Sequence, residues 1–187
     1  MINAIITDFD GTLVDTFEAN LLAYQKAFNQ VGLNLTAERY RECFGYRFER
    51  FMTAMAIFDD KTAGVIREAK KEYYPMFFER LKPNKALIEL ISGFHRMGGK
   101  TAIASTARKE NLMNACRFIG VEEIFDLIYA GIDVEQGKPS PEIYLKAMDV
   151  LGVLPSETLI FEDSEVGIQA AKSSGAYYMI VTQEQYL

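Results

Sequence analysis

Short, continuous apolar runs alternate with segments of helical periodicity along most of this chain. The apolar runs cover residues 3–8, 100–105, 126–130, 158–162 and 177–181. Runs without polar alternation are typical of strands in a parallel sheet that is covered on both faces. The helical patterns between them cover residues 85–98, 108–119, 141–151 and 165–174. This order predicts an α/β fold with a doubly wound, mainly parallel sheet.

The predicted helices carry recognisable ends. Pro141 follows Ser140, which predicts a helix with Ser140 as its N-cap and proline at its first position. Glycines at 98–99, 120, 152 and 175 mark the predicted helix ends.

Residues 16–82 break the alternation because they contain no convincing strand. An apolar stripe at spacings of three and four predicts one helix, and it consists of Phe17, Leu21, Tyr24, Phe28 and Val31. Further helices are predicted at 36–44, 47–58 and 60–80. The many aromatic residues of this stretch favour a small helical core. The chain is therefore expected to form an α/β core from residues 1–15 and 83–187, with an all-helical domain, 16–82, inserted.

Composition restricts the classes of function. The chain has 187 residues and a net charge of −6, which argues against nonspecific nucleic-acid binding. Cys43 and Cys116 do not have the spacing of a metal site, and helical periodicity predicts a buried thiol at Cys116. Free thiols and the lack of a recognisable leader indicate a cytoplasmic protein. No apolar run approaches the roughly 20 residues of a membrane span, so no membrane partner is expected.

The first apolar run ends in an acidic octet, Asp8-Phe9-Asp10-Gly11-Thr12-Leu13-Val14-Asp15. Two carboxylates at this spacing repel each other, and a divalent cation would relieve the repulsion. One carboxylate could attack phosphorus, while the second could protonate the leaving oxygen and then deprotonate water. Thr12 could offer a hydroxyl and an N–H group to an incoming anion. The alternative is a polar turn with Asp15 as a helix N-cap.

Polar residues also follow three later apolar runs, where a parallel sheet builds its sites. Ser105-Thr106 could bind a phosphate oxygen or simply cap a helix. Lys138, in Gly-Lys-Pro-Ser-Pro, could stabilise a transferring phosphoryl group or be a solvated lysine. Glu162-Asp163, in Glu-Asp-Ser-x-x-Gly, could provide hard oxygen ligands for Mg²⁺ or favour a helix N-terminus.

Together these four segments resemble, in order, the four motifs of the haloacid dehalogenase superfamily, most of whose members are phosphatases. The resemblance implies that Asp8 is the nucleophile and Asp10 the general acid and base. It implies a Mg²⁺ ion bound by Asp8, the backbone carbonyl of Asp10 and Asp163, with Glu162 in support. It also implies a phosphate-binding group that consists of Thr12, Ser105, Thr106 and Lys138.

The helical insertion resembles the cap of the phosphoglycolate phosphatase and β-phosphoglucomutase-like branch. Dehalogenases of the superfamily lack the second aspartate, so Asp10 argues against that activity. β-Phosphoglucomutases carry a histidine on the first cap helix, where this chain has Asn20. Phe44-Gly45-Tyr46-Arg47 resembles the cap substrate loop of hexose-phosphate phosphatases, although Arg47 could equally belong to a solvated face. Asn20 and Arg47 are the candidate substrate contacts of the cap.

The sequence thus predicts a Mg²⁺-dependent phosphomonoesterase with an aspartyl-phosphate intermediate. Its expected partner is a small phosphate ester, most simply a sugar phosphate, and its expected state is a monomer or weak homodimer. Phosphoryl transfer of the β-phosphoglucomutase kind is the main alternative. A noncatalytic phosphate-binding module is the second alternative, from a different class of function. Cap closure, with hinges near residues 14–16 and 79–84, is expected as well.

Overall fold

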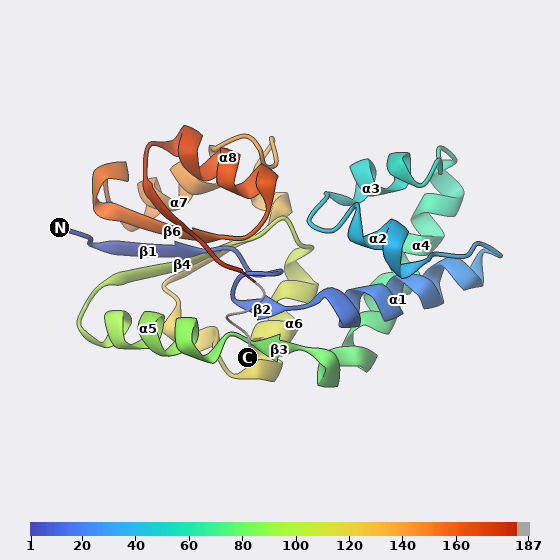
Figure 1. Cartoon of the computed structure of the whole chain (residues 1–187), viewed down its shortest axis with the longest axis horizontal. Coiled ribbons are helices and arrows are strands. Elements are labelled where there is room, and N and C mark those ends of the chain that lie inside the picture. Colours follow the sequence, from blue (N-terminus) through green and yellow to red (C-terminus); the bar gives the residue numbers. More distant parts are fainter. Residues whose placement is uncertain (183–187) are drawn as a thin grey trace. The chain divides into compact units, whose positions relative to one another are not determined.

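The structure is a computed structural model that describes residues 1–182 (Figure 1). The chain forms two compact units. One is an α/β unit made of residues 1–15 and the chain from residue 82 onwards, and the other is a helical unit made of residues 16–81.

A five-stranded parallel sheet forms the centre of the α/β unit. In spatial order its strands are β5 (Leu127–Tyr129), β4 (Lys100–Ala104), β1 (Ala4–Thr7), β6 (Thr158–Glu162) and β7 (Tyr177–Ile180). Ile6 pairs in register with Ala102 on one side and Ile160 on the other. The predicted parallel sheet is confirmed, with strands up to two residues shorter than their apolar runs.

Helices cover both faces of this sheet, as a doubly wound fold requires. Figure 1 shows helices on either side of the strands. They are α5 (Lys85–Arg96) and α6 (Lys109–Ile119) on one side, and α7 (Glu142–Leu151) and α8 (Glu165–Ser174) on the other. Short 3-10 helices lie in the connections: η2 (Glu122–Ile124), η3 (Gly131–Asp133) and η4 (Pro155–Glu157).

Helix ends follow the sequence signals with one correction. Gly120, Gly152 and Gly175 adopt positive φ and end α6, α7 and α8, as predicted. The predicted start of α7 is wrong by one residue, because Pro141 is the N-cap and the helix begins at Glu142. The Ser140 hydroxyl still accepts a hydrogen bond from the Glu142 N–H, at 3.3 Å.

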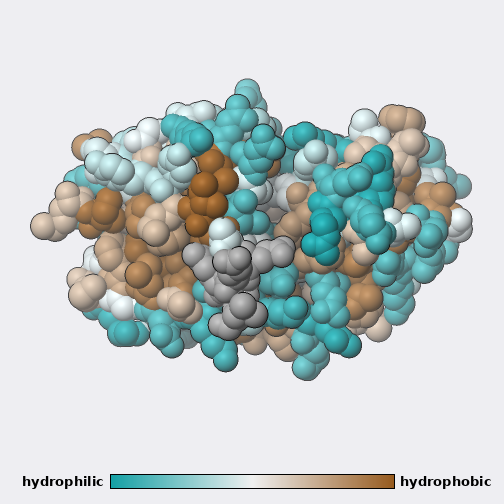
Figure 2. All heavy atoms as spheres, in the orientation of Figure 1, coloured by the Kyte–Doolittle hydropathy of each residue, from teal (hydrophilic) through white to brown (hydrophobic). Residues whose placement is uncertain are grey.

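Strand β7 departs from the expected pattern of burial. All four of its residues are exposed, and Tyr177 and Ile180 retain 60% and 52% of their accessible surface. Among the described residues it is the edge strand and pairs with β6 alone. Figure 2 shows hydrophobic residues at the surface of the α/β unit. The expectation that every strand is covered on both faces is therefore wrong for β7.

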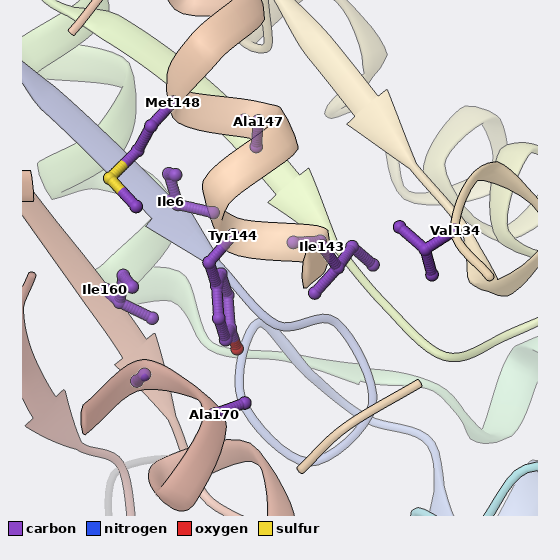
Figure 3. Close-up of a cluster of buried hydrophobic side chains, with 11 residues drawn as sticks. Ile6, Val134, Ile143, Tyr144, Ala147, Met148, Ile160 and Ala170 are labelled. Carbon is purple, nitrogen blue, oxygen red and sulfur yellow. The ribbon is translucent and has the colours of Figure 1, made fainter. Parts of the chain in front are cut away.

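The core of the α/β unit lies between the sheet and helices α7 and α8 (Figure 3). Ile6 and Ile160 contribute from the central strands, Ile143 and Tyr144 from α7, and Ala170 from α8. All five are fully or almost fully buried. Small residues on α8 let that helix approach the sheet closely.

The helical unit has its own, largely aromatic core. Its elements are α1 (Phe17–Gln30), α2 (Ala37–Arg41), α3 (Phe48–Ala54), α4 (Asp60–Tyr73) and the 3-10 helix η1 (Tyr74–Arg80). Helix α1 packs against α4 and η1. The Phe51 ring meets Tyr24 edge-on, with 4.9 Å between ring centroids, and also contacts Phe28 and Tyr40. The expected small aromatic core of this stretch is confirmed, although Phe58 is exposed.

A two-stranded antiparallel ribbon marks the places where the chain leaves and re-enters the α/β unit. It consists of β2 (Val14–Asp15) and β3 (Lys82–Pro83), with Asp15 opposite Lys82. The Lys82 ammonium lies 3.7 Å from the Asp15 carboxylate.

Both cysteine thiols are buried and unlinked, which confirms the prediction for Cys116. Burial, with Glu122 and Asp10 adding to it, raises the pKa of the Cys116 thiol to about 12. Among the described residues, no helix combines the length and the apolar character that crossing a membrane needs.

Candidate active site

The loop after β1 places Asp8 at the carboxyl end of the central strand. The Asp8 N–H donates to the Phe161 carbonyl at 3.0 Å, so Asp8 still continues the sheet ladder. The loop then closes on itself, because the Gly11 N–H donates to the Val14 carbonyl at 2.8 Å and the Val14 N–H to Phe9 at 3.0 Å. The chain folds back within six residues.

Gly11 satisfies two requirements of this loop. Its φ of +92° is costly for residues with a side chain. A Cβ at this position would also collide with the Asp163 carboxylate. Glycine therefore allows the first loop to approach the acidic residues that follow β6.

Lys138 is the central cation of the site. Its Nζ donates to Asp8 Oδ1 at 2.6 Å, to Glu162 Oε1 at 2.5 Å and to the Ala104 carbonyl at 3.0 Å. A lysine ammonium has three protons, and each has an acceptor here. Burial lowers the pKa of Lys138, but Asp8 and Glu162 outweigh burial and hold that pKa well above its ordinary value. Lys138 is therefore charged, and it links the ends of β1, β4 and β6.

Glu162 is buried, and donors occupy both of its oxygens. Oε1 accepts from Lys138 and from the Tyr144 hydroxyl, the latter at 2.8 Å. Oε2 accepts from the N–H groups of Asp163 and Ser164 at 3.0 and 3.1 Å, and from the Ser164 hydroxyl at 3.2 Å. Five donors use the four or so lone-pair sites of a carboxylate. Burial raises the pKa of Glu162, but Lys138 and these hydrogen bonds outweigh it and lower that pKa overall.

Gly167, the glycine of the Glu-Asp-Ser-x-x-Gly segment, lies as close to a carboxylate as Gly11 does. Ser164 is the N-cap of α8, and its hydroxyl accepts from the Gly167 N–H at 3.1 Å. A Cβ on Gly167 would collide with the Glu162 carboxylate. The first turn of α8 can therefore close against Glu162 only without a side chain at this position.

Asp8, Glu162 and Asp163 bring one carboxylate oxygen each within 4.8 Å of one another. Asp163 accepts one hydrogen bond from the Thr12 hydroxyl, at 2.8 Å. Burial, with a contribution from Glu162, raises the pKa of Asp163 to about 7. Burial likewise raises the pKa of Asp8, against the opposing charge of Lys138. Asp8 is buried and Asp163 half-buried, and both carboxylates resist ionisation, while the donors around Glu162 already occupy its oxygens. This arrangement fits a hard divalent cation held by Asp8 and Asp163.

Asp10 and Ser105 meet at the next strand end. The Ser105 hydroxyl donates to Asp10 Oδ2 at 3.3 Å and accepts from the Ala107 N–H at 3.0 Å. Thr106 is half-buried, and its carbonyl lies where a side chain on Gly131 would collide. The structure therefore brings Asp10 and Ser105 together, and it places Thr106 directly after Ser105.

The two candidate substrate contacts, Asn20 and Arg47, lie in the helical unit. Asn20 is buried in α1, and its Nδ2 donates to the Thr16 carbonyl at 3.2 Å. Arg47 is half-buried at the N-cap of α3. Their role in substrate binding stays a prediction.

Two residues that the sequence did not single out for this site support it. Tyr144 binds Glu162, but its place in the apolar stripe of α7 marks it only as core. Asn84 caps α5 by accepting from the Leu87 N–H, and its Nδ2 donates to the Thr12 carbonyl at 3.4 Å. The Asn84 N–H also donates to the Leu13 carbonyl at 2.9 Å, so Asn84 braces the loop that carries Asp8. The available sequence signal for Asn84 was its position as an asparagine after a proline.

Comparisons with known proteins agree with this arrangement. The family model described as haloacid dehalogenase-like hydrolase matches residues 5–181. The phosphorylated carbohydrates phosphatase of Thermotoga maritima is 31% identical over 176 residues, which cover 92% of this chain and 81% of that protein. The β-phosphoglucomutase of Bacillus subtilis is 28% identical over 196 residues, which cover 97% and 84%.

A solved structure has a similar fold and a similar level of sequence identity. A variant of the protein CbbY from Rhodobacter sphaeroides, crystallised in complex with xylulose-(1,5)bisphosphate, superposes with a TM-score of 0.86 at 32% identity. The match covers 97% of this chain and 87% of that one. The chain belongs to the haloacid dehalogenase-like hydrolase family and is an enzyme of its phosphatase and β-phosphoglucomutase-like branch.

Proposed function

We propose that this enzyme hydrolyses phosphomonoesters of small metabolites, sugar phosphates above all, with Mg²⁺ as cofactor. The observation that carries the proposal is the buried Asp8 carboxylate, which is held by Lys138 beside Glu162 and Asp163. The names of a phosphatase for phosphorylated carbohydrates and of a protein bound to a sugar bisphosphate support the substrate class.

Asp8 and Asp163 would hold the Mg²⁺ ion, together with the Asp10 backbone carbonyl that the family likeness adds. Glu162 would support the ion without binding it directly, because hydrogen-bond donors already occupy its own oxygens. When bound, the ion offsets the repulsion between Asp8 and the phosphate and stabilises the charge of the transition state.

In the first half-reaction, a carboxylate oxygen of Asp8 attacks phosphorus. The bond between phosphorus and the ester oxygen breaks, and Asp10 gives its proton to that oxygen, so the alcohol leaves and an aspartyl-phosphate remains. In the second half-reaction, water attacks phosphorus while Asp10 takes its proton. The bond between Asp8 and phosphorus breaks, and inorganic phosphate leaves.

The remaining polar residues would bind the phosphoryl oxygens. Lys138 binds Asp8, and Ser105 binds Asp10. Thr12 lies on the same loop as Asp10, and Thr106 directly follows Ser105. Because the three protons of Lys138 are already engaged, a phosphoryl oxygen must replace one of its present acceptors.

The decisive experiment replaces the nucleophile. Asp8→Asn should reduce kcat/KM for a panel of sugar phosphates by about a thousandfold or more, since an amide cannot form the acyl-phosphate. Asp149→Asn, on the exposed face of α7, is the control and should keep normal activity. Full activity of Asp8→Asn would refute the proposed function.

A second experiment tests the metal. Mg²⁺ should raise the Tm of the wild-type protein, because a ligand that binds only the folded state stabilises it. Asp163→Asn should abolish most of this increase, and chelation of Mg²⁺ should abolish hydrolysis. An unchanged Mg²⁺ response in Asp163→Asn would contradict the proposed ligand set.

The β-phosphoglucomutase relative makes phosphoryl transfer the second candidate function. Asn20, where such mutases carry histidine, favours hydrolysis. The test is to incubate the enzyme with β-glucose 1-phosphate and the bisphosphate activator. If glucose 6-phosphate forms faster than phosphate is released, phosphoryl transfer replaces hydrolysis as the first candidate function.

A further inference from the structure

Tyr144 places a hydroxyl group against the charged cluster from inside the hydrophobic core. It is fully buried, and Figure 3 shows its ring extending from α7 past Ile160 with the hydroxyl oxygen at its far end. That hydroxyl donates to Glu162 Oε1 at 2.8 Å. The Lys138 Nζ also lies over the Tyr144 ring, 5.1 Å from the ring centroid, a distance at which a cation is attracted to an aromatic ring.

Tyr144 and Lys138 share one acceptor atom, Oε1 of Glu162. With the hydroxyl present, this buried oxygen has two donors. Without it, Lys138 would be the only donor to Oε1, and the attraction of Glu162 for the ammonium would grow. Lys138 would then be drawn away from Asp8 and held more tightly in its present arrangement.

We propose that Tyr144 is a positioning residue that sets the place of Lys138 through Glu162. This inference rests on the proposed function, in which Lys138 has to turn from its present acceptors toward a phosphoryl oxygen. The Tyr144 hydroxyl partly compensates the Glu162 charge, so Lys138 can give up one acceptor at a lower cost. Tyr144 itself does not reach the reacting atoms.

Tyr144→Phe is the matched variant, because it removes one oxygen atom and keeps the ring that packs in the core. We expect kcat to fall about tenfold, within the range that one hydrogen bond to a charged group can supply. KM should stay within about twofold, because an interaction made mainly in the transition state is lost. Tyr73→Phe is the control, since it removes a tyrosine hydroxyl that binds Gln30 at 3.2 Å in the helical unit, and it should leave kcat unchanged.

A double-mutant cycle tests the same coupling without any substrate. Urea unfolding is measured for the wild type, Tyr144→Phe, Lys138→Met and the double variant. The factor by which Tyr144→Phe changes the unfolding equilibrium constant should differ at least about threefold between the two Lys138 backgrounds. Lys138→Arg replaces Lys138→Met if the latter does not fold.

The two measurements separate the inference from the proposed function. If the wild type hydrolyses phosphomonoesters and Tyr144→Phe keeps the wild-type kcat, the inference is wrong and the proposed function stands. If the wild type hydrolyses none of them, the proposed function is wrong, and the cycle alone decides on Tyr144. Additive effects in the cycle overturn the positioning role in either case.

Discussion

Lys138 has a surrounding that few lysines in proteins share, since its ammonium group is buried among two carboxylates and a carbonyl. Burial of a charge is tolerated only when partners compensate it. Here the compensation is mutual, because Lys138 also offsets the charges of Asp8 and Glu162. Removal of Lys138 would leave the Asp8 and Glu162 carboxylates buried without the ammonium group that offsets their charges.

Lys138→Met should therefore impair both stability and activity. Loss of one partner of a buried pair typically costs about 3–5 kcal/mol of unfolding free energy. We expect kcat/KM to fall about a thousandfold, because a donor to the transferring phosphoryl group is lost as well. Urea unfolding and steady-state kinetics would measure the two effects, with the exposed Lys172→Met as control. Near-wild-type kcat/KM in Lys138→Met would exclude Lys138 from the site.

Some residues of the candidate site could be predicted from the sequence and others could not. Asp8 and Asp10 are charged residues at the end of an apolar run, where polarity is costly and therefore conspicuous. Lys138 is marked instead by its Gly-Lys-Pro-Ser-Pro setting. Tyr144 carries no such signal, because tyrosine on the apolar face of a helix is ordinary core. Only the crossing of α7 with β6 brings its hydroxyl to Glu162.

At the scale of elements, the first turn of α7 fixes the loop that carries Lys138. Glu142 is the first residue of this helix, and its two oxygens accept from the N–H groups of Glu135 and Gln136 at 2.9 and 2.7 Å. Lys146, one turn later, lies 2.8 Å from the same carboxylate. These contacts lower the pKa of Glu142 to about 2, with Lys146 as the largest cause.

This shift predicts a pH-dependent effect of Glu142→Gln on stability. A carboxyl group whose pKa is lower in the folded than in the unfolded state stabilises the fold above its unfolded pKa, here 4.5. That stabilisation is lost as the pH falls from about 4.5 towards 2. The wild type should thus be more stable than Glu142→Gln at pH 7, and the difference should shrink at pH 3. Urea unfolding at both pH values measures it.

Glu38→Gln is a control of the same residue type, also in the first turn of a helix, α2. A difference between wild type and Glu142→Gln that does not change with pH would contradict the role given to the Glu142 carboxylate.

At the scale of the whole molecule, the described residues form two compact units. The α/β unit contains all of the proposed nucleophile, metal and phosphate contacts. These are Asp8 to Thr12, Ser105, Thr106, Lys138, Glu162 and Asp163. The helical unit has an aromatic core of its own. The chain leaves the α/β unit at Asp15 and returns at Lys82, and these two residues pair directly in the β2–β3 ribbon.

The α/β unit should therefore fold without the helical unit. Replacement of residues 16–81 by a Gly-Ser linker of about four residues would close β2 and β3 as a hairpin. We expect a cooperative thermal transition and a Mg²⁺-induced rise in Tm similar to that of the whole chain. Circular dichroism with and without Mg²⁺ would show both, with Asp163→Asn in the shortened chain as control. A shortened chain that folds but ignores Mg²⁺ would show that the metal site needs residues of the helical unit.

The sequence by itself determined the α/β class, the helical stretch after the first strand and the four polar segments at the strand ends. Those features are local, because they depend on periodicity, on glycine and proline, and on charges placed beside apolar runs. The tertiary structure alone decided that Lys138 has three acceptors, that Glu162 is saturated by donors and that Tyr144 and Asn84 support the site. The contacts of Lys138 and Tyr144, and those of Asn84 with the first loop, join residues that are distant in the sequence, up to 130 positions apart for Lys138 and Asp8. The exposure of β7 was decided in the same way, because its apolar run matches those of buried strands and only the strand order makes it an edge.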